Sequence, residues 1–357
     1  MRIVISAGGT GGHIYPALAI LNKIKESDKD TEVLYIGTHN RMESDLIPSM
    51  GINYKSLEII GFNRKKILSN IKTLNLFLKA IKQAKQYLLE FKPDIVIGCG
   101  GYVTAPVIYA ANKLGIKTFI HEQNSVVGMS NKFLSKYATK IGVSFKETLN
   151  AFPKDKVVLT GNPCGDYATK VKEASKKEFG LSNKKKLVLI AMGSLGSRTV
   201  NDKIVSYLND FKDNYEVLFV TGKTYYDKVK NLKTKANIKI VPYINELVRV
   251  LKITDVFVTR AGASSISEIE ALKVPSIFIP SPYVPNNHQY KNADVLVKNG
   301  AGIMIEESAL TKEKLLHEID TLLNDKAKYE GIVNNLNKIK VDNSLDKIYE
   351  IIENLVK

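Results

Sequence analysis

Cysteine is scarce in this chain, and the residue types that hold metal ions do not cluster along it. Cys99 and Cys164 are the two cysteines, and their separation fits neither a redox pair nor a metal site. This usage excludes a disulfide framework and predicts a reducing, cytoplasmic environment. The sequence also lacks a D-x-D pair, an H-E-x-x-H motif and any cysteine cluster. We therefore expect no metal site and no cofactor.

Long apolar runs are missing as well. None reaches the roughly 18 residues that a membrane-spanning helix needs. Met1 and Arg2 lead directly into a short apolar strand that glycines interrupt, so we predict no signal peptide. A chain of 357 residues is long enough for two full hydrophobic cores, and two domains are the natural expectation.

Acidic residues are outnumbered by basic ones. The chain has 52 lysines and arginines against 36 aspartates and glutamates, a formal net charge of +16. An excess of this size suits nucleic acid, an anionic membrane or an anionic substrate as a partner, and it equally suits lysines that are merely solvated. The position of the charge along the chain is therefore more informative than the total.

The segment 64–92 concentrates this charge, with eight basic residues and a single acid, Glu90. Apolar residues recur in it at helical spacing, namely Ile67, Ile71, Leu74, Leu78 and Ile81. One interpretation is a core-facing helix with a solvated basic face, and another is a basic, apolar-tipped surface that rests on an anionic membrane. A nucleic-acid groove ranks last because no binding motif accompanies the charge.

Short apolar strands alternate with helical patterns in both halves of the chain. The expected strands are Ile3–Ser6, Val33–Ile36, Asp94–Gly98, Thr118–His121, Ile141–Val143, Val157–Thr160, Leu187–Ala191, Val217–Thr221, Ile238–Val241, Val256–Thr259 and Ile277–Pro280. Such alternation is typical of parallel sheets with crossover helices. Proline and glycine at 161–163 punctuate the chain between the halves, so we predict two α/β domains with a cleft between them.

Glycine-rich turns follow four of these strands. They are Gly8-Gly9-Thr10-Gly11-Gly12-His13, Gly98-Cys99-Gly100-Gly101-Tyr102, Gly193-Ser194-Leu195-Gly196-Ser197-Arg198 and Arg260-Ala261-Gly262-Ala263-Ser264-Ser265-Ile266-Ser267-Glu268. A strand, a glycine turn and a helix N-terminus together favour anions, because unpaired N–H groups and the helix dipole attract negative charge. A tight packing turn is the alternative. The spacing matches neither a dinucleotide fingerprint nor a P-loop.

Polar clusters follow other strands. His121-Glu122-Gln123-Asn124 ends one strand, and it reads either as the lining of a cleft or as a capped loop. His288, Gln289 and Asn292 open a helix and suit a polyhydroxyl ligand such as a sugar. Ser265 and Glu268 are spaced either as a capping box or as a phosphate turn with a carboxylate for ribose hydroxyls.

Taken in order, these motifs closely resemble the MurG family of bacterial glycosyltransferases, which add N-acetylglucosamine to lipid I in peptidoglycan biosynthesis. The resemblance covers essentially the whole chain, including Gly161-Asn162-Pro163 and Gln289-Tyr290-x-Asn292-Ala293. It implies an α/β GT-B fold of two Rossmann-like, doubly wound parallel-sheet domains. Residues 1–161 would form the acceptor and membrane domain and residues 162–341 the UDP-N-acetylglucosamine domain, with a helix at about 342–357 packing back onto the first.

The resemblance also implies site residues. Donor-binding positions would be Thr10, Gly11, Gly12, Asn124, Ser194, Arg198, Ile244, Arg260, Gly262, Ala263, Ser264, Ser265, Glu268, His288, Gln289 and Asn292. Acceptor-binding positions would be Gly8, Gly9, Gly100, Gly101 and Tyr102. The membrane patch would comprise Lys65, Lys66, Ile71, Lys72, Leu74, Phe77 and Leu78.

The implied reaction is an inverting, metal-independent displacement at the anomeric carbon by the 4-hydroxyl of N-acetylmuramic acid. His13 is the candidate base, with a usual pKa near 6.5, and Glu122 is the second candidate. Positioning of a phosphate or of the loop is the alternative role for His13. The implied partners are UDP-N-acetylglucosamine, lipid I and the anionic inner membrane surface, with no nucleic acid. The implied location is peripheral, at the cytoplasmic face of the membrane.

Three positions depart from the family pattern. Gly165 stands where arginine is usual, Leu195 where glutamine is common and Met192 where glycine is common. The first puts one cationic contact in doubt, which Arg198 or Arg260 could replace. Two other functions compete with the transferase: a GT-B enzyme that acts on a diacylglycerol lipid, and a non-enzymatic nucleotide or nucleic-acid binder.

Overall fold

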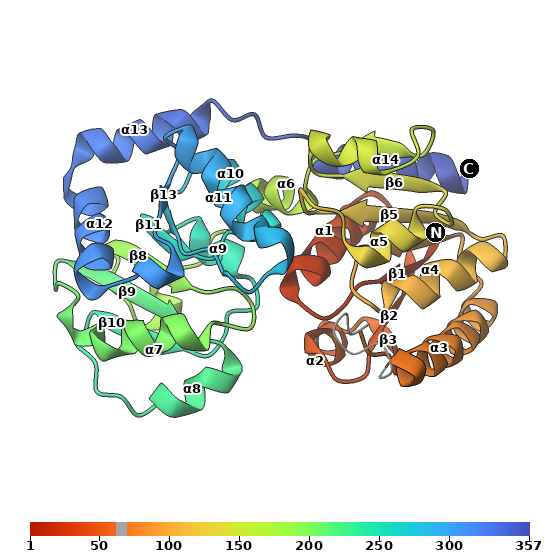
Figure 1. Ribbon diagram of the computed structural model, residues 1–357, viewed down its shortest axis with the longest axis horizontal. Helices are drawn as coiled ribbons and strands as arrows, with labels where there is room; N and C mark the ends of the chain where they lie inside the picture. The colour runs from red at the N-terminus through yellow and green to blue at the C-terminus, as the bar shows by residue number, and fades with distance from the viewer. Residues whose placement is uncertain (62–69) are drawn as a thin grey trace. The chain divides into compact units, whose positions relative to one another are not determined.

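The computed structural model describes residues 1–61 and 70–357, and its contacts divide them into two compact units (Figure 1). Unit 1 comprises residues 1–163 and 342–357, and unit 2 comprises residues 164–341. The chain thus enters unit 2 once and returns to unit 1 for its last helix.

Unit 1 is built on a parallel sheet with strand order β3-β2-β1-β4-β5-β6-β7. Its strands are β1 (Arg2–Ser6), β2 (Glu32–Thr38), β3 (Asn53–Leu57), β4 (Ile95–Gly98), β5 (Lys117–Glu122), β6 (Lys140–Val143) and β7 (Val157–Leu159). Its helices are α1 (Gly11–Ser27), α2 (Met42–Ser49), α3 (Asn70–Phe91), α4 (Thr104–Lys113), α5 (Met129–Leu134) and α14 (Ser344–Val356).

Helices cover both faces of this sheet because its central strands are apolar on both sides. Ile3, Val4 and Ile5 of β1 are all fully buried, which is what a doubly covered parallel strand requires. Val4 belongs to a core cluster with residues of α3, α4 and α5. Helix α14 contacts α1, β4 and β5, so the end of the chain completes the core of unit 1.

Unit 2 repeats the design with strand order β10-β9-β8-β11-β12-β13. Its strands are β8 (Lys186–Ala191), β9 (Tyr215–Val220), β10 (Ile238–Val241), β11 (Val256–Thr259), β12 (Ser276–Phe278) and β13 (Ile303–Met304). Its helices are α6 (Pro163–Lys170), α7 (Arg198–Ser206), α8 (Lys223–Val229), α9 (Leu247–Leu251), α10 (Ala263–Leu272), α11 (His288–Lys298), α12 (Lys312–Asn324) and α13 (Lys326–Asn337).

The predicted fold class, two doubly wound parallel sheets, is confirmed. In each sheet the order of connection reverses at the first strand, between β1 and β4 in unit 1 and between β8 and β11 in unit 2. Ligands of such sheets bind at the carboxyl ends of the strands beside this reversal. All four glycine turns follow strands β1, β4, β8 and β11. The topology therefore brings the turns together in pairs, one pair in each unit.

Two edge strands escaped the sequence analysis. Strand β3 has a single buried residue, Leu57, and polar residues elsewhere, so it has no apolar run to detect. Strand β13 is two residues long. Both strands form because a neighbouring strand offers unpaired backbone groups, which is a property of the sheet rather than of the segment.

Helix α3 buries a different stripe from the one that its large apolar residues indicated. The buried positions are Thr73, Leu76, Ala80, Ala84 and Leu88. The alanines allow α3 to approach α4 closely, while the larger Ile71, Leu74 and Leu78 are 65%, 50% and 57% exposed. Of the two interpretations of this segment, the core-facing one is therefore wrong for these three residues. None of the helices in the described ranges is long and apolar enough to cross a membrane.

Candidate active site

The turns after β1 and β4 pack directly against each other in unit 1. Gly8 N–H donates to the Gly100 carbonyl at 3.2 Å. Gly9, Gly100 and Gly101 have φ angles of +93°, +103° and +90°, which other residues rarely adopt. A Cβ on Gly101 would lie 2.4 Å from the Gly8 oxygen. Glycine is thus required at this junction, which exposes backbone at the N-terminus of α1.

The buried side chain of Glu43 in α2 hydrogen-bonds the turn that follows β1. This side chain is fully buried, and one oxygen accepts from Gly9 N–H at 3.0 Å. The other oxygen accepts from the N–H of Thr38 at 3.0 Å and from its hydroxyl at 2.7 Å. The N–H groups of Gly8 and Gly9 are therefore engaged inside the protein. The N-terminus of α1, where the helix dipole favours negative charge, is the part of the motif that suits an anion.

His13 lies in that first turn, half-buried beside the second glycine turn. Its Nδ1 lies 3.1 Å from the Gly8 carbonyl oxygen. A carbonyl can only accept, so Nδ1 carries the proton and Nε2 has the lone pair in the neutral ring. Burial lowers the pKa of His13 below 6.5, against the opposing effects of the Gly8 carbonyl and of Glu122 and Glu43. At neutral pH the side chain is an uncharged acceptor at Nε2.

The polar run at the end of β5 faces inward. His121, Glu122 and Gln123 are at most 2% exposed. His121 Nε2 lies 3.0 Å from the Gly161 carbonyl, and Gln123 Nε2 donates to the Cys99 carbonyl at 3.1 Å. Burial lowers the pKa of His121 to about 4, so its ring is neutral. This network ties β5 to the neighbouring turns, as in the capped-loop interpretation.

Both carboxylate oxygens of Glu122 are surrounded by donors. Oε1 accepts from the backbone and side-chain nitrogens of Asn124 at 3.0 and 3.1 Å. Oε2 accepts from Gly128 N–H at 2.9 Å and from Asn131 Nδ2 at 3.0 Å. Four hydrogen bonds make Glu122 a rigid support for the half-buried Asn124 and for the loop that follows it.

In unit 2 the turn after β8 is wedged against the turn after β9. Gly193, Gly196 and Gly222 have φ angles of +81°, +73° and +86°. A Cβ on Gly196 would lie 2.2 Å from the Thr221 oxygen, and one on Gly222 would lie 2.6 Å from the Leu195 oxygen. The half-buried Ser194 is therefore carried on a turn that the backbone of a neighbouring loop holds in place.

The turn after β11 leads into α10, whose N-cap is Gly262 with no side-chain capping bond. Ser265 lies inside the helix, so the capping-box interpretation of Ser265 and Glu268 is wrong. The hydroxyl of Ser264 is buried and makes no hydrogen bond to any residue that the structure describes. Burial raises the pKa of Glu268 to about 8. An unpartnered hydroxyl and a desolvated carboxyl on the first turns of one helix indicate a polar ligand.

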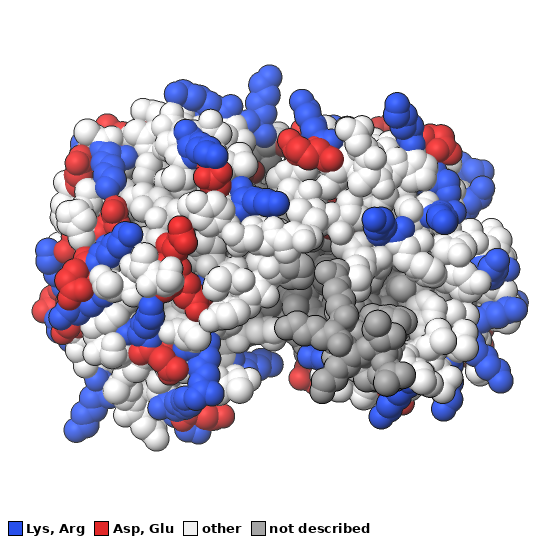
Figure 2. Space-filling view, in the orientation of Figure 1, with Lys and Arg blue, Asp and Glu red and all other residues white. Residues whose placement is uncertain are grey.

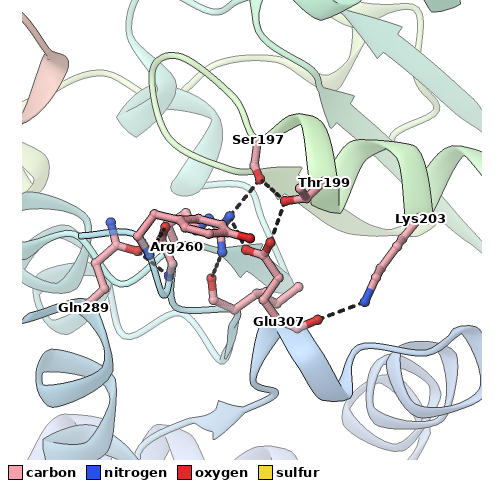
Figure 3. Close-up of polar contacts among 9 residues, drawn as sticks. Ser197, Thr199, Lys203, Arg260, Gln289 and Glu307 are labelled. Atoms are coloured by element: carbon pink, nitrogen blue, oxygen red, sulfur yellow. Dashed lines mark hydrogen bonds and ion pairs between the residues drawn. The ribbon is translucent and has the colours of Figure 1, made fainter. Parts of the chain in front are cut away.

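Arg198 and Arg260 are placed very differently. The Arg198 side chain is 78% exposed at the start of α7, with Nε 3.8 Å from Asp202. Arg260 is buried, and its Nη1 donates to the Ile279 carbonyl at 2.8 Å. Its Nη2 donates to Ser197 Oγ at 2.7 Å and pairs with Glu307 at 2.6 Å (Figure 3). Arg260 is thus committed to contacts inside unit 2.

Of the other predicted donor residues, Thr10, Gly11, Gly12 and Asn124 lie in unit 1, and the rest lie in unit 2. Asn292 is buried, and its Nδ2 donates to the Ala261 carbonyl at 3.0 Å in the turn after β11. Gln289 Oε1 accepts from Ser281 N–H at 2.8 Å. His288 is half-buried at the first position of α11, and Ile244 is half-buried between β10 and α9.

Gly165, where the family pattern has arginine, is packed tightly in α6. A Cβ at this position would lie 2.3 Å from Ser267 Oγ and 2.9 Å from the Ser267 carbonyl oxygen. Close approach of α6 to α10 therefore accounts for glycine here.

Helix α3 carries apolar and basic side chains on the surface of unit 1. Ile71, Leu74, Leu78 and Lys72 of α3 are exposed, and Phe77 is half-buried. Lys65 and Lys66 lie outside the described residues. In Figure 2, several basic side chains and few acidic ones lie at the right of the view, on the unit that carries α3.

Helix α5 extends this surface, which the sequence analysis missed. The rings of Phe133 and Phe77 meet edge to face with centroids 6.1 Å apart. A shallow cavity of about 420 Å³ beside them is lined by Met129, Lys132, Phe133, Lys136 and Tyr137. The signal was present: Met129 and Phe133 are four residues apart on one face of α5, and Tyr137 follows at the same interval just beyond the end of the helix. We call α3 and α5 with these side chains the α3/α5 surface.

Comparison with known proteins identifies the family. A Bacillus cereus protein named UDP-N-acetylglucosamine-N-acetylmuramyl-(pentapeptide) pyrophosphoryl-undecaprenol N-acetylglucosamine transferase 1 is 46% identical over 366 residues, covering 100% of both chains. The chain belongs to the MurG family of glycosyltransferases. The protein of that name from Halalkalibacterium halodurans is 45% identical, again over 100% of both chains. The models of the glycosyltransferase family 28 N-terminal and C-terminal domains match residues 3–143 and 187–348.

Solved structures agree with this membership. MurG from Acinetobacter baumannii matches with a TM-score of 0.70 and 28% identity, covering 99% of each chain. A UDP-GlcNAc 2-epimerase from Neisseria meningitidis bound to UDP-GlcNAc reaches a TM-score of 0.69 at 16% identity, over 99% of this chain and 100% of that one. The epimerase shares the GT-B fold alone. Within the described ranges, no group of three or more histidine, cysteine or acidic side chains is placed to hold a metal ion.

Proposed function

We propose that this protein transfers N-acetylglucosamine from UDP-N-acetylglucosamine to the 4-hydroxyl of N-acetylmuramic acid in lipid I, giving lipid II with inversion. One observation carries the proposal. Each unit has a pair of glycine turns at the reversal of its strand order. In unit 2 a desolvated carboxyl, Glu268, lies on the helix that follows one of these turns. Membership of the MurG family, at 46% identity over the whole chain, supports the choice of substrates.

Unit 2 is assigned to the donor. The diphosphate meets Ser194 and the N-termini of α7 and α10, where backbone N–H groups and helix dipoles favour negative charge. Ser264 supplies a buried hydroxyl that has no hydrogen-bond partner among the described residues. Glu268 accepts from the ribose hydroxyls when its carboxyl is ionised. The same dipoles stabilise the charge that grows on the departing UDP.

Unit 1 is assigned to the acceptor. The pyrophosphate of lipid I meets the first turn of α1 and the Gly100-Gly101 turn. His13 serves as the base, because its proton lies on Nδ1 and its Nε2 is left to accept a proton from the sugar hydroxyl. Glu122 is a positioning residue for Asn124, since four donors already occupy its oxygens.

The α3/α5 surface is assigned to the membrane. Exposed Ile71, Leu74 and Leu78 supply apolar area, and the lysines around them favour anionic lipid. Lipid I carries its sugar on a membrane-embedded lipid, and this surface would bring the enzyme to it. We place the protein at the cytoplasmic face of the membrane, as a peripheral protein.

The decisive test is transfer of radiolabelled N-acetylglucosamine from UDP-N-acetylglucosamine to a short-chain lipid I analogue. We expect labelled lipid II, at a rate that EDTA does not change, and no transfer to a diacylglycerol acceptor. Absence of transfer to lipid I beside an active family member would refute the proposal. Transfer to diacylglycerol alone would keep the enzyme class and change the acceptor.

A further inference from the structure

A buried acidic residue, Glu307, is linked through other side chains to the Gly193–Ser197 turn, which is assigned to the donor diphosphate. Glu307 lies in the 3-10 turn Glu307–Ala309 and is 8% exposed. One carboxylate oxygen pairs with Arg260 Nη2 at 2.6 Å, and the other accepts from the hydroxyl of Thr199 in the first turn of α7. Figure 3 shows Glu307 facing both partners from below the helix. The carboxylate thus joins the end of β11 to the start of α7.

Arg260 extends the link to the glycine turn itself. Its Nη2 also donates to Ser197 Oγ at 2.7 Å, and Ser197 is the N-cap residue of α7. Serine at this position ordinarily bonds an N–H group of the first helical turn. Here Ser197 makes no capping bond, because its hydroxyl is directed to Arg260 and to Thr199. The Ser197 side chain therefore does not occupy the first-turn N–H groups of α7.

Further contacts hold the link in place. Lys203 of α7 donates to the carbonyls of Glu307 and Leu310 at 2.9 and 3.1 Å. On the opposite side, the turn is wedged by the close approach of Gly196 to the Thr221 carbonyl. The Gly193–Ser197 turn is thus held from two sides before any ligand binds. A turn that is already ordered pays less conformational entropy when the donor diphosphate binds, so its ordering acts on the donor KM.

We propose that Glu307, acting through Arg260 and Ser197, is a positioning residue that sets the Gly193–Ser197 turn for the donor diphosphate. This inference rests on the proposed function of unit 2. The carboxylate keeps the guanidinium neutralised and directed at Ser197, instead of leaving a buried cation to be drawn to the phosphates. Arg260 then contributes to donor binding through the turn, and the backbone N–H groups make the contacts.

The test compares Glu307→Gln and Ser197→Ala with the wild type in the transfer assay and in UDP-N-acetylglucosamine binding by calorimetry. Glutamine keeps the shape and an acceptor for Thr199 but removes the charge that holds Arg260. We expect Glu307→Gln to raise the donor KM about tenfold, with kcat within about threefold and the lipid I KM unchanged. Ser197 is half-buried, and its replacement by alanine leaves the Arg260–Glu307 pair intact. Ser197→Ala should therefore raise the donor KM by a smaller factor.

Matched controls are Glu306→Gln, the exposed neighbour of Glu307, and Ser206→Ala at the exposed end of α7. Neither should change the donor KM. A merely structural role of Glu307 would lower the melting temperature and the active fraction, and hence the apparent kcat, and leave the donor KM unchanged. If folded Glu307→Gln and Ser197→Ala proteins keep the wild-type donor KM, this inference is wrong and the proposed function still stands. A wild-type protein that does not bind UDP-N-acetylglucosamine overturns it together with the proposed function.

Discussion

His13 shows how a single hydrogen bond decides the chemistry of a side chain. The Gly8 carbonyl takes the Nδ1 proton, so the ring presents Nε2 as an acceptor. Partial removal from water lowers its pKa, so the ring stays neutral at physiological pH. A histidine protonated at pH 7 could not accept a hydroxyl proton. The same geometry would be of little use to a residue that only binds phosphate.

Replacing His13 by alanine should therefore reduce kcat about 10²- to 10⁴-fold and change the donor KM little. In the wild type, kcat should fall as pH drops below about 6.5, because protonation of Nε2 removes the base and the pKa lies below that value. The measurement is kcat against pH with the soluble acceptor, with His317→Gln on the exposed side of α12 as control. A His13→Ala enzyme that retains most of its kcat would assign the imidazole to positioning.

Glu268 makes a second prediction at this scale, because burial raises its pKa to about 8. Its neutral form predominates at pH 7, and only the ionised form accepts from both ribose hydroxyls. Affinity for UDP-N-acetylglucosamine should therefore rise about tenfold between pH 7 and pH 9, where the diphosphate is already fully ionised. Calorimetry should show this rise in the wild type and in Glu270→Gln, and a weak, nearly pH-independent affinity in Glu268→Gln. A flat wild-type profile would count against the ribose assignment.

At the scale of elements, α3 shows how small residues on one helical face expose large ones on another. Ala80 and Ala84 pack against the sheet and α4, and this rotation leaves Ile71, Leu74 and Leu78 in solvent. Three exposed large side chains on one helix suit an apolar partner. Together with the rings of α5 they form a surface that a soluble monomer has no need to expose.

We expect the triple variant Ile71→Ser, Leu74→Ser, Leu78→Ser to lose binding to vesicles that contain anionic lipid. Its activity on a soluble acceptor should stay within about twofold of the wild type, because the substitutions touch neither glycine turn. Flotation on a density gradient measures the first effect. Val295→Ser, an equally exposed apolar residue on α11, is the control and should float like the wild type. If the triple variant still floats with both neutral and anionic vesicles, these three residues do not bind the membrane, and the assignment of the α3/α5 surface to the membrane is wrong.

At the scale of the whole molecule, the chain closes the core of unit 1 with its last helix. Leu345, Ile348 and Ile352 of α14 are at most 2% exposed, and α14 packs on α1. The core of unit 1 therefore depends on residues that are synthesised after the whole of unit 2. Unit 2 is one continuous stretch, residues 164–341, so α14 belongs to unit 1.

Replacing Ile352 by alanine should cost unit 1 about 2–5 kcal/mol of stability, because it leaves a cavity in a filled core. Hydrogen exchange resolved by peptide should show faster exchange in β1, β4 and β5 and unchanged exchange in β8 and β11. Glu353→Gln, the partly exposed neighbour on α14, should change neither unit. Equal loss of protection in both units would mean that they unfold as one cooperative body.

Some residues of the candidate site could be predicted from the sequence, and others could not. Gly8, Gly100, Gly193 and Gly262 could be located because an apolar strand followed by glycines is a local pattern. Glu43 and Glu307 could not, because nothing in the spacing of residues reports which distant turn a carboxylate will reach. His121 and Glu122 were recognised as unusual, but whether they face a ligand or the interior depends on the segments packed around β5.

The sequence by itself determined the two α/β units, the positions of the four glycine turns and the family. Each of these follows from the spacing of apolar residues or from motifs of neighbouring residues. Tertiary structure alone decided which turns touch, which nitrogen of His13 carries the proton and which face of α3 is exposed. It also decided that Arg260 is held by Glu307. These outcomes depend on contacts between segments tens to hundreds of residues apart, and the free energy of such contacts is set by burial and geometry that no local pattern encodes.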